Sequence, residues 1–252
     1  MKPAIVLPFH DPTGVYFSQL EAVTPQLKYV FSRAFVSISP VTLQMHSQRI
    51  SALGEDPFFS FNFNDPDSLV GDHYRSAYRS AVDSCAPDLA LHLCDIDKVA
   101  FVLQSEYRDL FLADIQKASN ENSPVLFQRT PAAWASYPKN YREIEHLAIQ
   151  VAEFLFGKYI DIAWSHLVIR AGHLNTILPQ LKSRDFGILA EILLLLKDVI
   201  GTKDVDWLLW EDPFIYSRNP DDLKTERDNS IEETQKRLQW LRPIMRVLLD
   251  SV

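Results

Sequence analysis

The stretch Leu89-Ala90-Leu91-His92-Leu93-Cys94-Asp95-Ile96-Asp97 is the centre of the fold prediction for this chain. Its first six residues form an apolar run with the length of a buried strand, and two carboxylates at a spacing of two follow. Burying such carboxylates is costly unless a cation or protons neutralise them. Ligands bind at the ends of such strands in α/β sheets, and hard cations prefer oxygen ligands. Asp95 and Asp97 are therefore candidates for holding a divalent metal that carries a diphosphate.

Strand and helix patterns alternate on the N-terminal side of this stretch. Strands are predicted at residues 4–7, 34–39 and 58–63, and helices at 15–27 and from Gly71-Asp72 onward. Alternation of this kind predicts an α/β fold with a mostly parallel central sheet and helices on both of its faces.

The C-terminal half is less regular. We predict strands at 125–129, 164–170 and 205–210, helices at 144–155, 173–181 and 186–200, a polar loop at 217–229 and an amphipathic helix at 231–249. Gly157 and Gly201 are expected to end the two helices before them. The simplest organisation is one Rossmann-like domain over residues 1–216, with a C-terminal helical extension, residues 217–252, packed on it.

The composition excludes several classes of protein. The chain has 252 residues, which is enough for one large domain with a sizeable core. Its net charge of −8 disfavours nonspecific binding to nucleic acid, so no such partner is expected. Two cysteines do not make a disulfide scaffold, so a cytoplasmic location is expected. The N-terminus is too interrupted for a signal peptide, and the longest apolar stretch, 188–196, is too short for a transmembrane segment. The oligomeric state stays unknown.

Four segments carry a family resemblance. They are Ile5-Val6-Leu7-Pro8-Phe9-His10, Gly71-Asp72-His73-Tyr74-Arg75-Ser76-Ala77, Asp95-Ile96-Asp97 and Arg184-Asp185-Phe186-Gly187-Ile188. In this order they resemble a first strand with its Pro-containing turn, a Gly-led helix start, a DxD metal motif and an acceptor-side acidic segment. The chain from about residue 4 to 216 thus resembles a GT-A nucleotide-sugar glycosyltransferase, and more narrowly the mannosylglycerate synthase-like, family 2-like branch.

The resemblance implies a function and its partners. The protein would transfer a sugar from a GDP- or UDP-sugar donor to an unidentified acceptor, with Mn²⁺ or Mg²⁺ as cofactor. Asp95 would lie near the nucleotide ribose and Asp97 would coordinate the metal, which would stabilise the charge that develops on the departing diphosphate. Asp185 would orient an acceptor hydroxyl or act as a base, and Glu191 is the competing candidate for this catalytic role.

Further candidates lie in loops and at a helix start. Pro8 and His10, in the first loop, are candidates for contact with the donor. Gly71, Asp72 and Arg75 are further donor candidates, because the start of a helix binds anions well. Arg129 and Trp134 are candidates for the acceptor, because an arginine can bind an anion and an aromatic ring can stack on a sugar.

Two features depart from the family's pattern. The second predicted strand ends in Ser37-Ile38-Ser39-Pro40, where many relatives carry a carboxylate that contacts the base or ribose. The segment 211–216 lacks the histidine that commonly serves as third metal ligand, and Asp212 is the obvious substitute.

Other functions stay open. Asp95 to Val99 also fits the motif of haloacid-dehalogenase phosphatases, in which Asp95 would be the nucleophile and Asp97 a general acid. That motif normally lies on the first strand of its domain, whereas three predicted strands precede it here. The departures also allow a catalytically weakened GT-A domain that binds a nucleotide or a partner. In a purely structural alternative, one aspartate caps the helix that follows.

Overall fold

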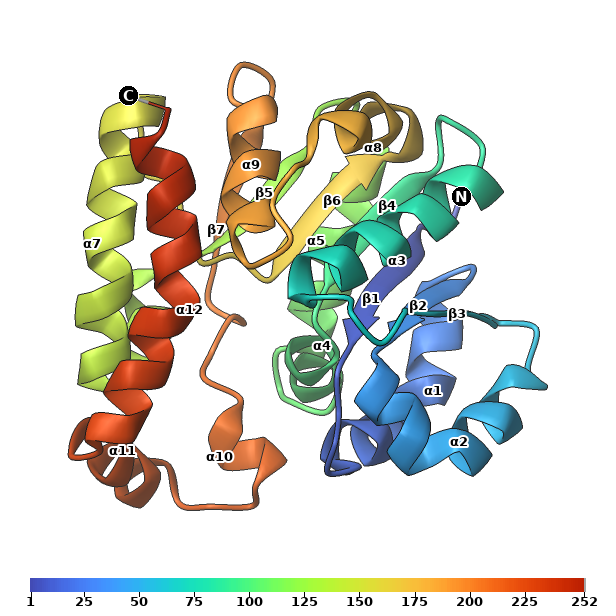
Figure 1. Cartoon of the computed structure of the whole chain (residues 1–252), viewed down its shortest axis with the longest axis horizontal. Helices are drawn as coiled ribbons and strands as arrows, with labels where there is room; N and C mark the ends of the chain where they lie inside the picture. The colour runs from blue at the N-terminus through green and yellow to red at the C-terminus, as the bar shows by residue number, and fades with distance from the viewer. Residues whose placement is uncertain (252) are drawn as a thin grey trace.

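The computed structural model, which describes residues 1–251, has the expected α/β fold. Seven strands form one sheet in the order β3-β2-β1-β4-β6-β5-β7 (Figure 1). The strands are β1 (Ala4–Phe9), β2 (Ala34–Ile38), β3 (Phe59–Phe63), β4 (Ala90–Cys94), β5 (Val125–Arg129), β6 (His166–Arg170) and β7 (Gly201–Val205). Strand β6 runs antiparallel to β4 and β5, and the other neighbouring strands are parallel. The prediction of a mostly parallel sheet is confirmed.

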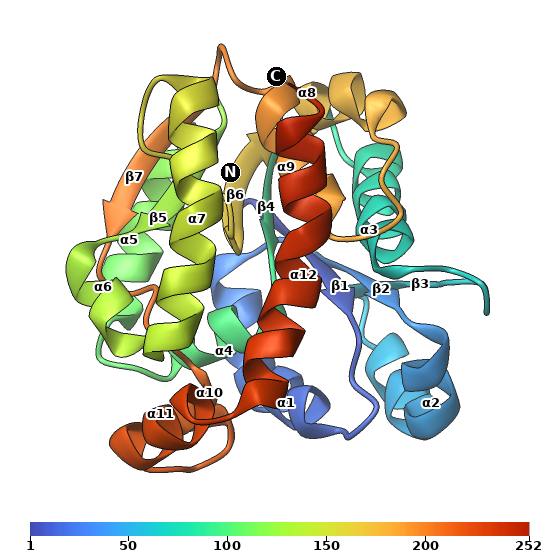
Figure 2. The ribbon, with the colours of Figure 1, turned by 60° about the vertical axis from the view of Figure 1, so that its left-hand side comes forward.

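Helices cover both faces of this sheet (Figure 2). One face carries α1 (Val15–Val30), α2 (Pro40–Gly54), α4 (Ile96–Leu103) and α5 (Arg108–Asn120). The other face carries α3 (Val70–Ser84), α7 (Lys139–Phe156), α8 (Ala171–Ile177), α9 (Gly187–Leu195) and α12 (Ile231–Leu249). Short connections contain α6 (Pro131–Ser136), the 3-10 helix η1 (Leu178–Gln180), α10 (Asp212–Ile215) and α11 (Pro220–Asp228). The C-terminal helix α12 packs against α7 and α9.

The sheet separates two hydrophobic clusters. Along β1, Ala4 and Val6 belong to the cluster under α3 and α7, whereas Ile5 and Leu7 belong to the cluster under α1 and α4. Successive side chains of a strand point to opposite faces, so a strand covered on both faces must be apolar throughout. This explains the continuous apolar run that precedes Asp95.

The strand order changes direction at β1. Strands β2 and β3 continue on one side of β1, and β4 lies on its other side. In open α/β sheets, ligands bind in the crevice at such a switch point, outside the carboxyl ends of the strands. Pro8, Phe9 and His10 lie where β1 ends, and Asp95 follows the last residue of β4.

Several predictions for the second half need correction. The run 205–210 is not a strand beyond Val205, although Trp207, Leu208 and Trp210 are buried. Burial in the core produces the same apolar run as pairing in a sheet, so periodicity alone does not separate the two. The helix predicted at 186–200 ends at Leu195, and Gly201 begins β7 instead of ending that helix.

The polar segment 217–229 is also not a simple loop, because it contains α11. The Asn219 side chain accepts hydrogen bonds from the amides of Asp221 and Asp222, and Pro220 takes the first helical position. The extension predicted for 217–252 is described as far as residue 251, and residue 252 lies outside the described part. In residues 1–251, no helix combines the length and apolar composition that crossing a membrane requires.

Candidate functional site

A cavity of about 710 Å³ opens where β1 and β4 end. Its wall is built from the turn after β1, the first turns of α3 and α4, the segment before β6, and parts of α7, α9, α10 and α12. Its size lies within the range of small-molecule sites, roughly 300–1,000 Å³. Of the predicted site residues, this wall contains Pro8, His10, Asp95, Asp97, Arg129 and Asp212.

Asp95 is the residue between β4 and α4. Its carboxylate accepts a hydrogen bond of 3.1 Å from the Tyr74 hydroxyl, so it is directed to the wall of the cavity and not to the amides of α4. Burial raises the pKa of Asp95 to about 6, although the Tyr74 hydrogen bond and the charge of Lys98 act against this. The Asp95 side chain therefore does not cap the next helix, whereas Asp97 accepts a hydrogen bond of 2.9 Å from the Lys98 amide in the first turn of α4.

Asp97 and Asp212 add two further carboxylates to the same wall. Asp97 lies in the first turn of α4, and burial together with the charge of Glu211 raises its pKa well above the usual range. Asp212 begins α10, and burial and Glu211 raise its pKa to about 6. We call Asp95, Asp97 and Asp212 the cavity carboxylates. Asp212 Oδ2 lies 3.4 Å from Arg227 Nη2, but the raised pKa values of all three indicate that neighbouring cations only partly balance their negative charge.

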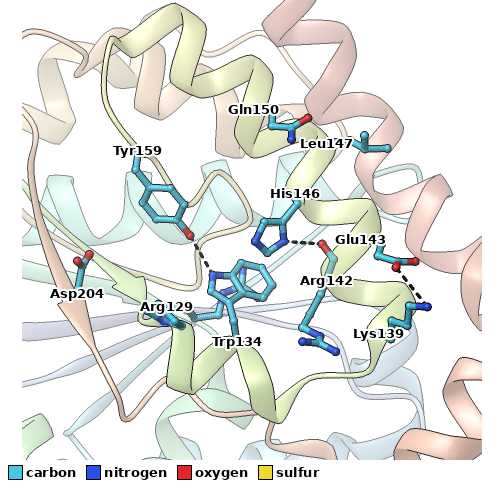
Figure 3. A pocket seen from close by; sticks show the side chains of 11 residues that line it. Arg129, Trp134, Lys139, Arg142, Glu143, His146, Leu147, Gln150, Tyr159 and Asp204 are labelled. Atoms are coloured by element: carbon cyan, nitrogen blue, oxygen red, sulfur yellow. Dashed lines mark hydrogen bonds and ion pairs between the residues drawn. The ribbon is translucent and has the colours of Figure 1, made fainter.

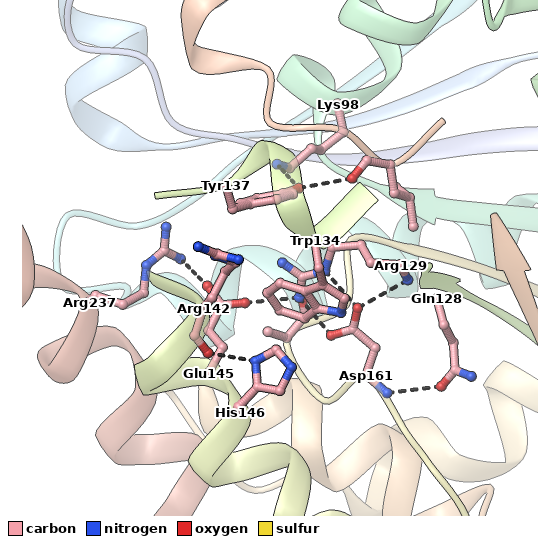
Figure 4. Close-up of polar contacts among 12 residues, drawn as sticks. Lys98, Gln128, Arg129, Trp134, Tyr137, Arg142, Glu145, His146, Asp161 and Arg237 are labelled. Carbon is pink, nitrogen blue, oxygen red and sulfur yellow. Dashed lines mark hydrogen bonds and ion pairs between the residues drawn. The ribbon is translucent and has the colours of Figure 1, made fainter. Parts of the chain in front are cut away.

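Lys98 is the cation that all three cavity carboxylates share. Its ammonium contacts the Glu211 carboxylate. It also donates to the Tyr137 hydroxyl at 3.1 Å (Figure 4). Burial alone would lower its pKa, but Glu211, Tyr137 and Asp97 outweigh burial and raise it. Lys98 is therefore charged at neutral pH. Its charge lowers the pKa of each cavity carboxylate, but by less than burial raises it.

These oxygen donors fit a hard divalent cation. Within residues 1–251, however, the group of three potential ligands whose atoms lie within 4.8 Å of one another is His92, Cys94 and His166, not the cavity carboxylates. Mg²⁺ is usually held by one or two carboxylates together with water and substrate phosphates. The wall therefore fits a metal that arrives with a diphosphate better than it fits a preformed cage of three carboxylates.

Aromatic side chains also line the cavity. They include Tyr137, Tyr141, Trp164, Phe186, Trp210 and Trp240. The Arg237 guanidinium lies 3.9 Å from the centre of the Tyr141 ring, and its Nη1 is 3.1 Å from Glu145 Oε1. Such a surface can stack on a sugar ring or another flat group. These residues come from segments far apart in the sequence, and no local pattern marked them.

Arg129 and Trp134, the predicted acceptor residues, contact each other. Arg129 donates to Asp161 at 2.6 and 2.7 Å and to Glu145 at 2.9 Å, and its guanidinium lies 3.5 Å from the centre of the Trp134 ring (Figure 4). Trp134 donates to the Tyr159 hydroxyl and faces a second hollow of about 830 Å³ (Figure 3). Arg129 is thus neutralised by buried carboxylates, and Trp134 lies apart from the cavity carboxylates.

The predicted donor residues of α3 contact the predicted acceptor segment instead of the cavity. The Gly71 amide donates to the Arg184 carbonyl at 2.8 Å, and a Cβ at Gly71 would lie 2.5 Å from the Arg184 carbonyl carbon. Asp72 accepts from Arg184 at 2.8 Å and from Arg75 at 3.0 Å. We call Gly71, Asp72, Arg75, Arg184 and Asp185 the α3–α9 junction. Gly71 is required there because two backbones pass too closely for a side chain.

Asp185 and Glu191 fix the loop that leads into α9. Asp185 accepts from the Gly187 amide at 3.0 Å and from Arg246 at 3.0 and 3.1 Å. Glu191 accepts from the Lys182 amide at 2.9 Å and from the Ser183 hydroxyl at 2.8 Å. Of the residues described, the cavity wall includes neither of them. Their catalytic role stays a prediction.

The turn after β1 is held by a residue that the sequence did not single out. Asp11 is fully buried and accepts from the amides of Gly14 at 2.8 Å and Phe17 at 2.7 Å, which fixes the start of α1. His10, by contrast, is exposed, and its Nδ1 is hydrogen-bonded to Ser39 Oγ at 3.0 Å. The Asp-Pro-Thr-Gly sequence at 11–14 was a turn signal that could have identified this residue.

No protein-family model matches this chain, and none of the curated proteins matches its sequence.

Proposed function

We propose that this protein is a metal-dependent glycosyltransferase that moves a sugar from a nucleotide-diphosphate donor to an acceptor bound in the same cavity. The observation that carries the proposal is the set of cavity carboxylates, Asp95 and Asp97 after β4 and Asp212 on α10, beside the point where the strand order reverses, with a negative charge that the protein only partly balances. Uncompensated carboxylates in a cleft are candidates for a functional site, because structural carboxylates are normally paired.

The donor end of the proposed site is the acidic wall. Asp97 and Asp212, with Asp95 beside them, would hold Mn²⁺ or Mg²⁺. Bound there with the donor, the ion would neutralise charge on the departing diphosphate. The chain's own residues prepare this end, because Tyr74 orients Asp95 and the Lys98 ammonium forms an ion pair with Glu211. Tyr16 and the Pro8–His10 turn border the same space and would contact the nucleotide.

The acceptor end of the proposed site is the aromatic wall. Trp164, Trp210 and Trp240 offer ring faces on which a sugar or another flat acceptor can stack, and Arg237 lies beside them. Stacking would hold an acceptor hydroxyl toward the donor sugar and exclude water from the space between them. The proposal gives no role to Asp185 or Glu191, because their carboxylates are engaged in holding the loop before α9.

A second candidate is a domain that binds a nucleotide diphosphate without transferring a sugar. It is favoured by the positions of the cavity carboxylates, whose oxygens do not form a group of three within 4.8 Å in the described residues. A phosphatase that uses Asp95 as its nucleophile receives less support, because Asp95 follows the fourth strand of the chain and is shielded by Tyr74.

Isothermal titration with a panel of GDP- and UDP-sugars, each with and without Mn²⁺, tests the proposal. We expect metal-dependent binding of at least one donor, weakened about 10- to 100-fold in Asp97→Ala, since a charged contact to the ligand is lost. Asp72→Asn is the control, because Asp72 also lies in the first turn of a helix, α3, but outside the cavity wall. Absence of donor binding, or equal binding by Asp97→Ala, would count decisively against the proposal.

Slow hydrolysis of the bound donor then separates a glycosyltransferase from a domain that only binds the nucleotide. Hydrolysis can be measured although the acceptor is unidentified, because water takes the acceptor's place. A glycosyltransferase is expected to release the nucleotide slowly in the presence of Mn²⁺, and Asp97→Ala should lose this release. A protein that only binds the nucleotide would leave the donor intact at saturation.

A further inference from the structure

His92, Cys94 and His166 form a second group of potential metal ligands, inside the core. His92 and Cys94 are two residues apart on β4, so their side chains point to the same face of the sheet. His166 begins β6 and is directly opposite Cys94 in the antiparallel register. The ligand atoms of the three lie within 4.8 Å of one another. All three side chains are buried, with exposed fractions of 0%, 4% and 0% for His92, Cys94 and His166.

Hydrogen bonding within the fold does not explain why two histidines lie here. His92 Nε2 and His166 Nδ1 are 2.9 Å apart, so one ring donates to the other. In the described part of the chain, the outer nitrogens of both rings, His92 Nδ1 and His166 Nε2, have no hydrogen-bond partner. Buried polar atoms without partners are destabilising, and an apolar pair would fill this space at lower cost.

Aromatic rings surround the histidine pair. Phe31 and Phe111 lie 5.6 and 5.9 Å from the His92 ring, and Trp207 lies 5.0 Å from the His166 ring, measured between ring centres. Burial lowers the pKa of His92 to about 3 and also lowers that of His166, so both rings are neutral. Burial, with the charges of Asp95 and Asp97, raises the pKa of the Cys94 thiol well above its usual range, so this sulfur must lose a proton when a metal binds.

We propose that His92, Cys94 and His166 form a binding site for a soft closed-shell metal ion, with Cu(I) favoured over Zn(II). Thiolate and imidazole ligands select such ions. Metal–ligand bonds of about 2.0–2.3 Å around one ion place ligand atoms roughly 3.3–3.5 Å apart. The two ring nitrogens, now 2.9 Å apart, would therefore need to separate by only about 0.4–0.6 Å.

The binding step is an exchange of cation for proton without any redox change. Cys94 releases one proton and its sulfur bonds the ion. The imidazole that donates in the histidine pair moves its proton to its own outer nitrogen, so that both inner nitrogens bond the ion through lone pairs. Each ring stays neutral, and one proton leaves the protein for each ion bound.

Charge favours Cu(I) over Zn(II) at this position. A thiolate and Cu(I) sum to zero charge, whereas a thiolate and Zn(II) leave a positive charge among aromatic rings, which is costly in a core. Lys98 already places a positive charge close enough to lower the pKa of His166. Structural Zn(II) sites also take four ligands, and the described group supplies three.

The test uses the purified full-length protein under anaerobic conditions, titrated with Cu(I) against a chromogenic Cu(I) chelator. We expect one Cu(I) per chain that survives desalting, and X-ray absorption that shows sulfur and nitrogen neighbours. Cys94→Ala should weaken binding by at least about 100-fold. Cys85→Ala is the matched control, because Cys85 is the only other cysteine and lies outside the group, and it should bind as the unmodified protein does.

Three results would overturn the inference. They are loss of Cu(I) from the unmodified protein on desalting, equal affinity in Cys94→Ala, and an absorption spectrum without a sulfur neighbour. Retention of Zn(II) in preference to Cu(I) would overturn the choice of ion. X-ray absorption uses the unmodified protein, so it decides the question even where the Cys94→Ala variant fails to fold.

Discussion

Asp72 and Asp97 are both aspartates in the first turn of a helix, yet their surroundings shift their pKa values in opposite directions. At Asp72, burial alone would raise the pKa, but the hydrogen bond and charge of Arg184, the Leu69 amide and Arg75 outweigh it and lower the pKa. At Asp97, burial and Glu211 outweigh Lys98, and the pKa rises. Similar local positions therefore carry different electrostatics.

The difference separates carboxylates whose charge is compensated within the fold from carboxylates whose charge neighbouring groups compensate only in part. Those of the α3–α9 junction are paired with arginines and backbone amides, so their charge is compensated within the protein. The cavity carboxylates keep charge that burial disfavours, and a metal ion or protons would relieve it. The predictions below test this contrast.

The largest effect is expected where a compensating cation is removed from buried carboxylates. Arg129→Ala leaves Asp161 without an arginine and Glu145 with Arg237 alone, and both carboxylates are only 1% exposed. The free energy of unfolding should fall by about 3–5 kcal/mol, because uncompensated buried charge is strongly destabilising. Denaturant unfolding measures this, with Arg142→Ala, on the wall of the second hollow, as the control that should change little. Equal losses of unfolding free energy in Arg129→Ala and Arg142→Ala would contradict the expected importance of compensating buried carboxylates.

A ligand should stabilise the protein only through the cavity carboxylates. At 100 times its dissociation constant, GDP or UDP with Mn²⁺ is expected to add about 2.7 kcal/mol to the free energy of unfolding. The Asp72→Asn variant should keep this gain and Asp97→Ala should lose it. Thermal unfolding with and without Mn²⁺ and nucleotide measures the gain. A gain that survives in Asp97→Ala would remove the distinction between the two regions.

Neutral substitutions at the two first-turn aspartates should change stability in opposite directions. Without metal at pH 8, Asp97→Asn should stabilise the protein by about 1 kcal/mol, because it removes a buried charge. Asp72→Asn should destabilise it by about 1–2 kcal/mol, because it weakens charged hydrogen bonds and a helix cap. Urea unfolding of both variants gives the two signs, and a shared sign would break the comparison.

The smallest effects are expected in the pH dependence of the free energy of unfolding, which should differ between Asp95 and Asp72. Asp95 has a folded pKa of about 6 against an ordinary value of 3.8, so the stability it contributes is complete below about pH 4 and is lost as pH rises through 6. In metal-free protein, Asp95→Asn should therefore gain on the unmodified chain over this window, by up to about 1.4 kcal/mol per pH unit.

Asp72 should show the reverse pH dependence, because its folded pKa is lowered. Its contribution is present above its unfolded pKa and is lost as pH falls through the folded value. The advantage of the unmodified chain over Asp72→Asn should therefore shrink on acidification below about pH 4. Parallel unfolding series from pH 3 to pH 7 check both slopes, and slopes of the same sign would refute the contrast.

Local sequence patterns predicted much of the fold. They failed where the same residue or pattern is compatible with two kinds of structure. Strand β5 and helix α12 lie at the predicted residues, and Gly157 ends α7 with a left-handed φ of 65°. Pro40 was interpreted as the end of a strand, but it is also the first residue of α2, whose cap is the Ser39 side chain. Asn219-Pro220 begins α11 in the same way.

The sequence by itself determined the α/β alternation, the apolar strand before Asp95, and the position of Asp95 and Asp97 at the end of that strand. These follow from local periodicity, and from the rule that parallel strands end together at one edge of a sheet. Only the tertiary structure decided which carboxylates are compensated. Asp72 and Arg184 are 112 residues apart, and Lys98 and Glu211 are 113 residues apart. A pKa depends on charges and burial contributed by such distant segments, and no local pattern in the sequence records them.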